Sequence, residues 1–422
     1  MKFASKLFNK LKYLTMIVLV TTVVSCDSWL DLGSEDRIME NTLFSSQAGF
    51  MTALNGVYIE LLNSSLYGGT LSYKTFDILA QYYDCDKDEQ TWQKLSTFDQ
   101  TAKKGQVSGL WSKVYTLLVN VNTIIEACDE RKEVLNSEYY HVIKGEALAL
   151  RGLLHFEVFR VFGPIYSVDP ETECMPYSES SDLKVRPLLK ASDVARLMID
   201  DFKAAEELLK DYDPVIKKGA LWGDEGPGLP NDMVYRSLRL NYYAVKAYIA
   251  RLALYTGDKA TALMYARQVI KETQEDNNWF PFVTRAAATT LSKWDRVYKI
   301  LFGLYNLKRS DVYESTFSNK LGEKVILRPT DANIESLYEE DTRVNDWRYT
   351  EQWMTLKDPD GNEKKHFVKY MAVDDTEGPD DNKVSLGYTY LMPVMRISEM
   401  YLIVAECSND EAEAFDHLNR LR

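Results

Sequence analysis

The sequence predicts a mostly α-helical fold in which helices pack as antiparallel pairs and long, loop-rich inserts separate the pairs. Apolar residues recur at three- and four-residue spacings through most of the long segments, which is the pattern of one buried helix face. Several of these segments follow each other through short turns, and a short turn makes two helices run antiparallel. The stretches between them are rich in Gly, Pro and aromatic residues and lack this periodicity.

The predicted helices follow in chain order. Their apolar faces span residues 111–128, 143–161, 194–209, 244–255, 262–269, 397–405 and 414–421. Gly163-Pro164 ends the second helix, and Ser192 is placed to cap the third. Two short strands are expected within the inserts, at residues 325–327 and 367–373.

The clearest helix pair joins residues 240–255 to residues 259–272 through Gly257-Asp258. Alanines on both helices permit a close approach, at Ala244, Ala247, Ala250, Ala262 and Ala266. A Gly turn with Ala-rich spacing is typical of tetratricopeptide (TPR) packing. The pairs begin near residues 111, 240 and 397, so we expect a TPR-like scaffold interrupted by inserts. A generic helical bundle is the alternative that periodicity alone leaves open.

Composition excludes several classes of protein and site. The chain has 422 residues, 45% hydrophobic and 27% charged, which is an ordinary globular mixture rather than a disordered, collagenous or polytopic membrane chain. With 50 basic and 63 acidic side chains the net charge is −13, which argues against a nucleic-acid partner. The 4 His and 5 Cys show no metal-ligand spacing, and no nucleophile elbow, Walker loop or H-E-x-x-H motif occurs. We therefore expect no metal and no cofactor.

Residues 1–25 are predicted to be a lipoprotein signal peptide. Four lysines precede an uncharged stretch that is too short to span a membrane, and Val23-Val24-Ser25-Cys26 resembles a bacterial lipobox with Cys26 as the lipidated residue. A short membrane anchor with an incidental Cys is the alternative. The remaining residues 26–422 would form a single domain. Without the four signal-peptide lysines the net charge is −17, which fits a neutral ligand better than an anionic one.

A family resemblance emerges from seven weak motifs that occur in order along nearly the whole chain. They are Cys26–Asp31 (CDSWLD), Ala53–Tyr58 (ALNGVY), Trp111–Tyr115 with Asn122, Gly145–Gly152 (GEALALRG) running to Pro164, Asp200–Ala205, Ala247–Gly257 with Ala266, and Met392–Glu406. Together with the lipobox, this series resembles the SusD/RagB family, the nutrient-binding outer-membrane lipoproteins of Bacteroidetes. The chain stops at Arg422, where such proteins usually continue beyond an analogous helix, so it resembles a truncated member.

The resemblance implies a surface-exposed, lipid-anchored protein of the outer membrane. It would bind a glycan, or a peptide, without catalysis and deliver it to a TonB-dependent SusC-like barrel. Glu146, Arg151, Arg396 and Glu399 would then be scaffold contacts, the last two as an i,i+3 ion pair. A periplasm-facing TPR lipoprotein that scaffolds other proteins is the alternative, followed by a lipoprotein glycoside hydrolase, since 63 acids leave room for a carboxylate pair.

The binding site is expected on the loop-rich face that the resemblance implies. Sugar rings stack their apolar faces on aromatic rings, and exposed loop aromatics lose little entropy when they bind. The candidate ligand-binding aromatics are Tyr67, Trp92, Trp222, Trp279, Trp294, Trp347 and Trp353. Asp84 and Asp86 are candidate acceptors for sugar hydroxyls. A calcium loop at Asp84–Glu89 is the less favoured interpretation, because Glu89 and Leu95 replace the Gly and Glu of an EF-hand.

Overall fold

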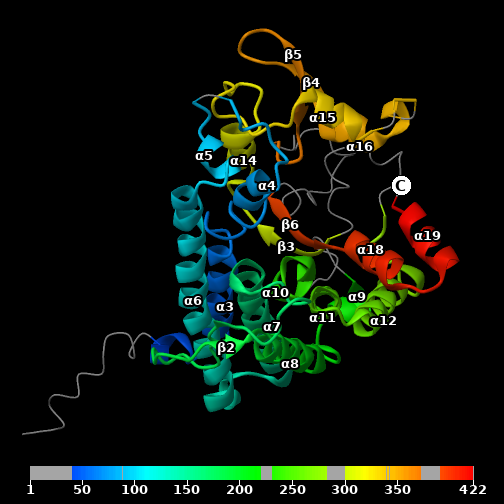
Figure 1. Ribbon diagram of the computed structural model, residues 1–422. Coiled ribbons are helices and arrows are strands. Elements are labelled where there is room, and N and C mark those ends of the chain that lie inside the picture. Colours follow the sequence, from blue (N-terminus) through cyan, green and yellow to red (C-terminus); the bar gives the residue numbers. More distant parts are fainter. Residues whose placement is uncertain are drawn as a thin grey trace, which may run out of the picture.

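The structure is a computed structural model that describes residues 40–87, 89–219, 231–282, 300–338, 340, 341, 343–371 and 390–421. Helices dominate the described part of the chain (Figure 1). The α-helices are α3 (Gln47–Glu60), α4 (Thr75–Leu79), α5 (Gln93–Ser96), α6 (Gln100–Glu130), α7 (Ser137–Phe162), α8 (Ala191–Leu209), α9 (Val215–Lys218), α10 (Asn231–Val234), α11 (Tyr242–Thr256), α12 (Lys259–Ile270), α14 (Arg309–Thr316), α15 (Asp331–Ser336), α16 (Trp347–Gln352), α18 (Ile397–Cys407) and α19 (Glu411–Asn419).

Short helical turns and strands complete the described elements. The turns are η1 (Lys132–Val134), η2 (Arg236–Leu238), η3 (Lys271–Glu275) and η4 (Arg343–Asn345). The strands are β1 (Glu173–Met175), β2 (Leu189–Lys190), β3 (Ile300–Tyr305), β4 (Trp353–Lys357), β5 (Glu363–Phe367) and β6 (Leu391–Arg396). They pair antiparallel as β1–β2, β3–β6 and β4–β5.

The helix pairs form the scaffold and confirm the predicted mostly α-helical, TPR-like fold. Helix α7 packs between α6 and α8, α11 packs against α12, and α18 packs against both α12 and α19. Gly257 ends α11 in the left-handed conformation (φ 85°), so the predicted turn is confirmed. The core runs continuously through these helices, because each buries one apolar face on its neighbours.

Two glycines explain why α7 and α8 approach closely. A Cβ on Gly145 would lie 2.8 Å from Leu209 Cγ, and one on Gly152 would lie 3.0 Å from Phe202 Cζ. Leu209 and Phe202 belong to α8, so its large side chains sit directly on the backbone of α7. The glycines of the Gly145–Gly152 motif therefore allow α7 to pack closely against α8.

Two local expectations need correction. Helix α6 begins at Gln100 rather than near Trp111, because Asp99 Oδ1 accepts a hydrogen bond (2.8 Å) from the Ala102 amide and caps a polar first turn. Helix α8 begins at Ala191, so Ser192 is not its N-cap. The Ser192 hydroxyl donates instead to Glu171 Oε1 at 3.2 Å.

The strands also differ from expectation. Residues 325–327 form no strand, with Val325 in a turn, and of the described residues 367–371 only Phe367 belongs to a strand, β5. The longest pair, β3–β6, joins segments about ninety residues apart, with Gly303 opposite Pro393. Such long-range pairing fixes the strands through tertiary contacts, which local periodicity does not report.

The irregular segments lie together at one end of the molecule. We call α4, α5, α14, α15, α16, β4 and β5 the loop-rich lobe, and Figure 1 shows these elements together, away from α8 and α12. The Thr91 amide donates to Lys324 O at 2.9 Å, and Asn319 Nδ2 donates to Lys357 O at 2.8 Å. The lobe is thus assembled from segments that lie far apart in the sequence.

The charged residues of the family motifs are structural, as expected. Glu146 is fully buried and accepts a hydrogen bond from the Tyr58 hydroxyl at 2.8 Å, while Arg151 Nε donates to Asp201 Oδ2 at 2.7 Å. The i,i+3 pairing of Arg396 with Glu399 was wrong. Glu399 pairs with Arg251 of α11 instead, which ties α18 to the helix beside it.

The four cysteines of the described chain are free. Cys128 and Cys407 are buried thiols within helices, and Cys85 is buried as well. Burial raises the pKa of Cys85 and of Cys128 to about 12. Among the described residues, no helix is both long enough and apolar enough to cross a bilayer.

Candidate functional site

Of the predicted aromatic residues, the structure describes the side chains of Tyr67, Trp92, Trp279 and Trp353, and each of these contacts different residues. Tyr67 is only 6% exposed and its hydroxyl donates to Glu157 Oε1 at 2.9 Å, so it is a core residue with no face for a ligand. We therefore withdraw Tyr67 from the candidate site. Cys26, Trp222 and Trp294 lie outside the described residues, as does the side chain of Trp347, whose backbone begins α16.

Trp92 and Trp279 are half-buried packing residues. Lys74 Nζ lies 4.4 Å from the centroid of the Trp92 ring, so a cation already covers part of that ring. Trp279 packs on the backbone at Gly219, where a Cβ would lie 2.4 Å from Trp279 Cε3. Gly219 has φ 69°, which suits Gly and leaves this close contact free of strain.

The acidic pair lies in the loop before α5. Asp84 Oδ2 is 3.4 Å from Lys87 Nζ, and Asp86 Oδ1 accepts from the Ser96 hydroxyl at 3.3 Å. No cluster of three or more His, Cys, Asp or Glu suited to a metal occurs among the described residues, which leave out Asp88. These two contacts fix the loop that precedes α5.

Trp353 belongs to an aromatic surface that the sequence interpretation identified only in part. Trp353 Nε1 lies 3.3 Å from the Tyr338 hydroxyl, and Tyr338 meets Tyr349 edge to face with ring centroids 5.1 Å apart. All three rings are partly exposed. We call Tyr338, Tyr349 and Trp353 the Trp353 surface. Tyr338 and Tyr349 were missed, although their position in the same irregular insert as Trp353 was a usable signal.

Cations border the Trp353 surface. Lys365 Nζ lies 4.3 Å from the Tyr349 ring centroid and donates to the Trp353 carbonyl at 3.2 Å. Burial, with the nearby charge of Arg343, lowers the pKa of Lys365. Phe367, opposite Trp353 in the β4–β5 pair, packs its ring against Trp353 with centroids 5.1 Å apart and also packs on the core. The surface thus combines exposed rings with fixed hydrogen-bond donors.

A carboxylate stabilises the lobe beneath this surface. Glu323 accepts hydrogen bonds from Lys364 and from Lys87, which joins β5 to the loop before α5. The hydrogen bond from Lys364, followed by that from Lys87, lowers the pKa of Glu323 to about 2. Because the group is about one third exposed, solvent reduces what these pairs contribute to stability.

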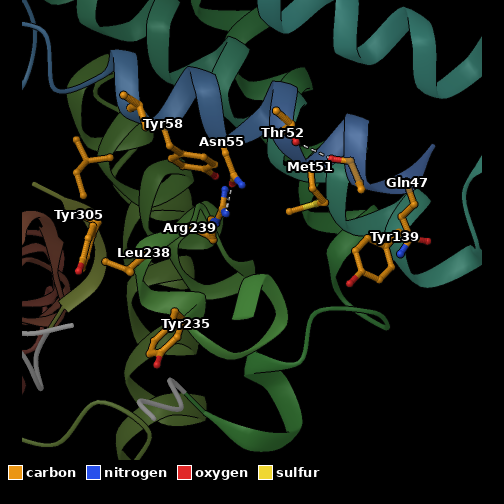
Figure 2. Close-up of a pocket in the computed structure, with 13 residues that line it drawn as sticks. Gln47, Met51, Thr52, Asn55, Tyr58, Tyr139, Tyr235, Leu238, Arg239 and Tyr305 are labelled. Carbon is orange, nitrogen blue, oxygen red and sulfur yellow. Dashed lines mark hydrogen bonds between the residues drawn. The ribbon is translucent and has the colours of Figure 1, made fainter. Parts of the chain in front are cut away.

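A cavity of about 630 Å³ lies elsewhere, between α3, η2 and β3. We call it the α3–η2 pocket. Figure 2 shows Arg239 between Asn55 and Tyr58, with Tyr235 and Tyr305 at one end and Gln47 and Tyr139 at the other. None of these seven lining residues was a candidate from the sequence.

The wall of the pocket rests on a buried charge network. Arg236 of η2 donates to Asp213 Oδ1 (2.8 Å) and Oδ2 (2.9 Å), and it also pairs with Glu146. The Tyr58 hydroxyl donates to Glu146 and accepts from the Leu240 amide at 3.0 Å. Burial lowers the pKa of Arg236, but Asp213 and Glu146 more than offset this, so its pKa is raised overall. The network fixes η2 against α3 and α7.

Two family models match the chain, one in its N-terminal part and one in its C-terminal part. Residues 28–215 match a family model described as "Starch-binding associating with outer membrane", and residues 258–422 match the model of the SusD family. A SusD-like protein of Bacteroides ovatus is 24% identical over 211 residues, which cover 49% of this chain and 36% of that protein. The matched part thus spans about a third of this relative.

Solved structures share the fold. A SusD-like carbohydrate binding protein from Bacteroides vulgatus superposes with a TM-score of 0.65 at 18% identity, covering 89% of this chain and 75% of the other. A laminarin binding SusD-like protein gives a TM-score of 0.59 at 15% identity, with 90% and 84% covered. At these identities the likeness concerns the fold.

Proposed function

This chain belongs to the SusD/RagB family, and on that premise we propose that it is a non-catalytic glycan-binding protein whose ligand rests on the Trp353 surface. The observation that carries the site is the set of three partly exposed rings on the loop-rich lobe. The family description and the laminarin-binding neighbour support a glycan as the ligand class.

The geometry suggests how a sugar chain is held. A pyranose places its CH face on the Trp353 ring, and a neighbouring residue of the chain reaches Tyr349 or Tyr338. The Lys365 ammonium, 4.3 Å from the Tyr349 centroid, can donate to a ring hydroxyl at the edge of this surface. Because Phe367 and Tyr338 hold Trp353 in place, little side-chain entropy is lost on binding.

Replacing Trp353 with Ala is expected to weaken glycan binding about tenfold, corresponding to ~1.4 kcal/mol. Isothermal titration with malto- and laminari-oligosaccharides measures this, and product analysis of the same mixtures checks that no bond is cleaved. Trp353→Phe retains a ring and should recover most of the affinity. If Trp353→Ala binds every oligosaccharide as the native chain does, while its melting temperature shows that it is folded, the ligand does not rest on this surface.

We also propose that Cys26 carries the lipid and that the chain faces the exterior, where it delivers glycan to a TonB-dependent SusC-like barrel. The lipobox pattern and the family description support this. Cys26→Ser is expected to abolish labelling with a fatty-acid probe and to release the protein from membranes. Labelling that survives the change would refute the anchor. Protease treatment of intact cells tests exposure, and protection of the native chain would favour a periplasmic scaffold.

A further inference from the structure

The α3–η2 pocket has a lining that differs in charge from the rest of the chain. The protein has 63 acidic side chains, yet among the described residues neither Asp nor Glu lines this cavity, and Arg239 is the one charged side chain that does. A site for sugar hydroxyls generally offers carboxylate acceptors as well as donors. This lining offers an Arg and the amides of Gln47 and Asn55 instead, so it suits a ligand group that accepts hydrogen bonds.

Arg239 has donors left over. Its Nη2 donates to Asn55 Oδ1, and its guanidinium lies 4.6 Å from the centroid of the Tyr58 ring. Its Nη1 is buried and has no hydrogen-bond partner within the described part of the chain, and Arg239 forms no ion pair there. A half-buried guanidinium without an ion-pair partner among the described residues favours an anionic group, such as a carboxylate, on the side that lines the pocket.

The carboxylate that contacts the lining residue Tyr58 is already engaged. Glu146 accepts from Tyr58 and pairs with Arg236, which also holds Asp213. The network of Glu146, Asp213 and Arg236 has a net charge of −1, and this charge attracts the Arg239 guanidinium at longer range. We therefore expect an anion in the pocket to bind modestly and to bind more weakly as salt is added.

The other residues that line the pocket suit a sugar ring next to the carboxylate of the ligand. Tyr235 and Tyr305 lie together at one end of the pocket in Figure 2, and Tyr305 is 39% exposed. Leu238 supplies an apolar surface between this end and Arg239, and Met51 supplies another on the side of Gln47 and Tyr139. A cavity of about 630 Å³ is large enough for one or two sugar rings.

We propose that the α3–η2 pocket is a second binding site, separate from the Trp353 surface, and that it takes a uronic-acid sugar whose carboxylate is bound by Arg239. The ligand class rests on the proposed glycan-binding function, whereas the site rests on the pocket and its unpaired cation. The ring of the sugar lies toward Tyr305 and Tyr235, and the carboxylate lies toward Arg239 and Asn55.

Titration of the full chain with galacturonate and with galactose tests the proposal, because these sugars differ only at C6, where galacturonate has a carboxylate and galactose a hydroxymethyl group. Galacturonate is expected to bind at least tenfold more tightly than galactose, and Arg239→Gln is expected to remove this preference. Arg239→Lys keeps the charge without the planar fork and should retain part of it. Arg196→Gln, which removes an exposed Arg of α8, is the matched control and should bind as the native chain does.

Other outcomes of these titrations would contradict the site or the assignment of the sugar. Equal binding of galacturonate by the native chain and by Arg239→Gln, or no binding by the native chain, overturns the proposal. Preference for a dipeptide with a free C-terminal carboxylate over galacturonate overturns the sugar assignment. Tyr305→Ala, at the exposed end of the pocket, provides a second loss-of-binding variant if Arg239→Gln fails to fold. Neutral glycan binding that depends on Trp353 would survive any of these failures.

Discussion

Replacing Arg236 with Met is expected to lower the free energy of unfolding by about 3–5 kcal/mol. Arg236 is 1% exposed and is the cation that Asp213 and Glu146 share, so its removal leaves two buried carboxylates without a counter-charge. The Tyr58 hydroxyl and the amides of Val215 and Tyr242 still donate to these carboxylates but supply no net charge. Urea unfolding followed by circular dichroism measures the change.

Two further variants separate this mechanism from simple loss of volume. Arg196→Met on the exposed face of α8 should change stability by no more than about 0.5 kcal/mol, because surface ion pairs contribute little. Adding Glu146→Gln to Arg236→Met should recover part of the loss, since one of the two stranded charges is then neutral. A double variant as unstable as Arg236→Met would show that packing rather than charge dominates. The same experiment bears on the α3–η2 pocket, because Arg236 anchors the turn that leads to Arg239.

The helical scaffold could be predicted because it depends on local patterns. The apolar faces of α7, α11 and α12 repeat every three to four residues, and Gly257 marks the turn between the last two. The first turns of α6 were missed because residues 100–109 are largely polar and exposed, and Asp99 alone signals the start of the helix. The β3–β6 pair was missed because its partners meet only after the intervening chain has folded.

The exposure of an aromatic side chain could not be read from its presence in a loop. Tyr67 and Trp353 both lie in segments without helical periodicity, but the Tyr67 hydroxyl donates to the buried Glu157, whereas Trp353, at the start of β4, stays at the surface beside Tyr338. Ring exposure is decided by tertiary neighbours, which one sequence does not identify. The same is true of Arg239, whose contacts with Tyr58 and Asn55 join it to residues more than 180 positions earlier in the sequence.

The overall net charge did not predict the charge of the α3–η2 pocket lining. A charge of −17 on residues 26–422 favours a neutral ligand on average. A binding site, however, responds to the groups that line it, and the lining of the α3–η2 pocket is positive. Long-range repulsion from an acidic surface slows the approach of an anion and is screened within about 8 Å at physiological salt. An anionic group held against Arg239 is therefore compatible with an acidic chain.

A fall in pH from 7 to 5 is expected to destabilise the protein through His155, by about 2 kcal/mol. His155 is fully buried in α7 and its ring stacks on Tyr177 with centroids 3.7 Å apart. Its Nε2 accepts from the Ser178 amide at 2.9 Å, and its Nδ1 lies 2.9 Å from the Arg151 carbonyl. These two contacts suit a neutral ring that carries its proton on Nδ1, because a proton on Nε2 would face the Ser178 N–H.

The direction of the effect follows from the pKa of His155. Burial, together with the positive charges of Arg151 and Arg186, lowers this pKa to about 3, whereas the unfolded chain has a pKa near 6.5. Below pH 6.5 the unfolded chain binds the proton and the folded chain does not, so stability is full above that pH and is lost as pH falls toward 3. Urea unfolding at pH 7 and pH 5 measures the loss, and His155→Gln should be less stable at pH 7 but should lose much less between the two. An equal loss in both proteins would mean that another group causes it, with the buried His366, whose pKa burial also lowers, as the next residue to replace.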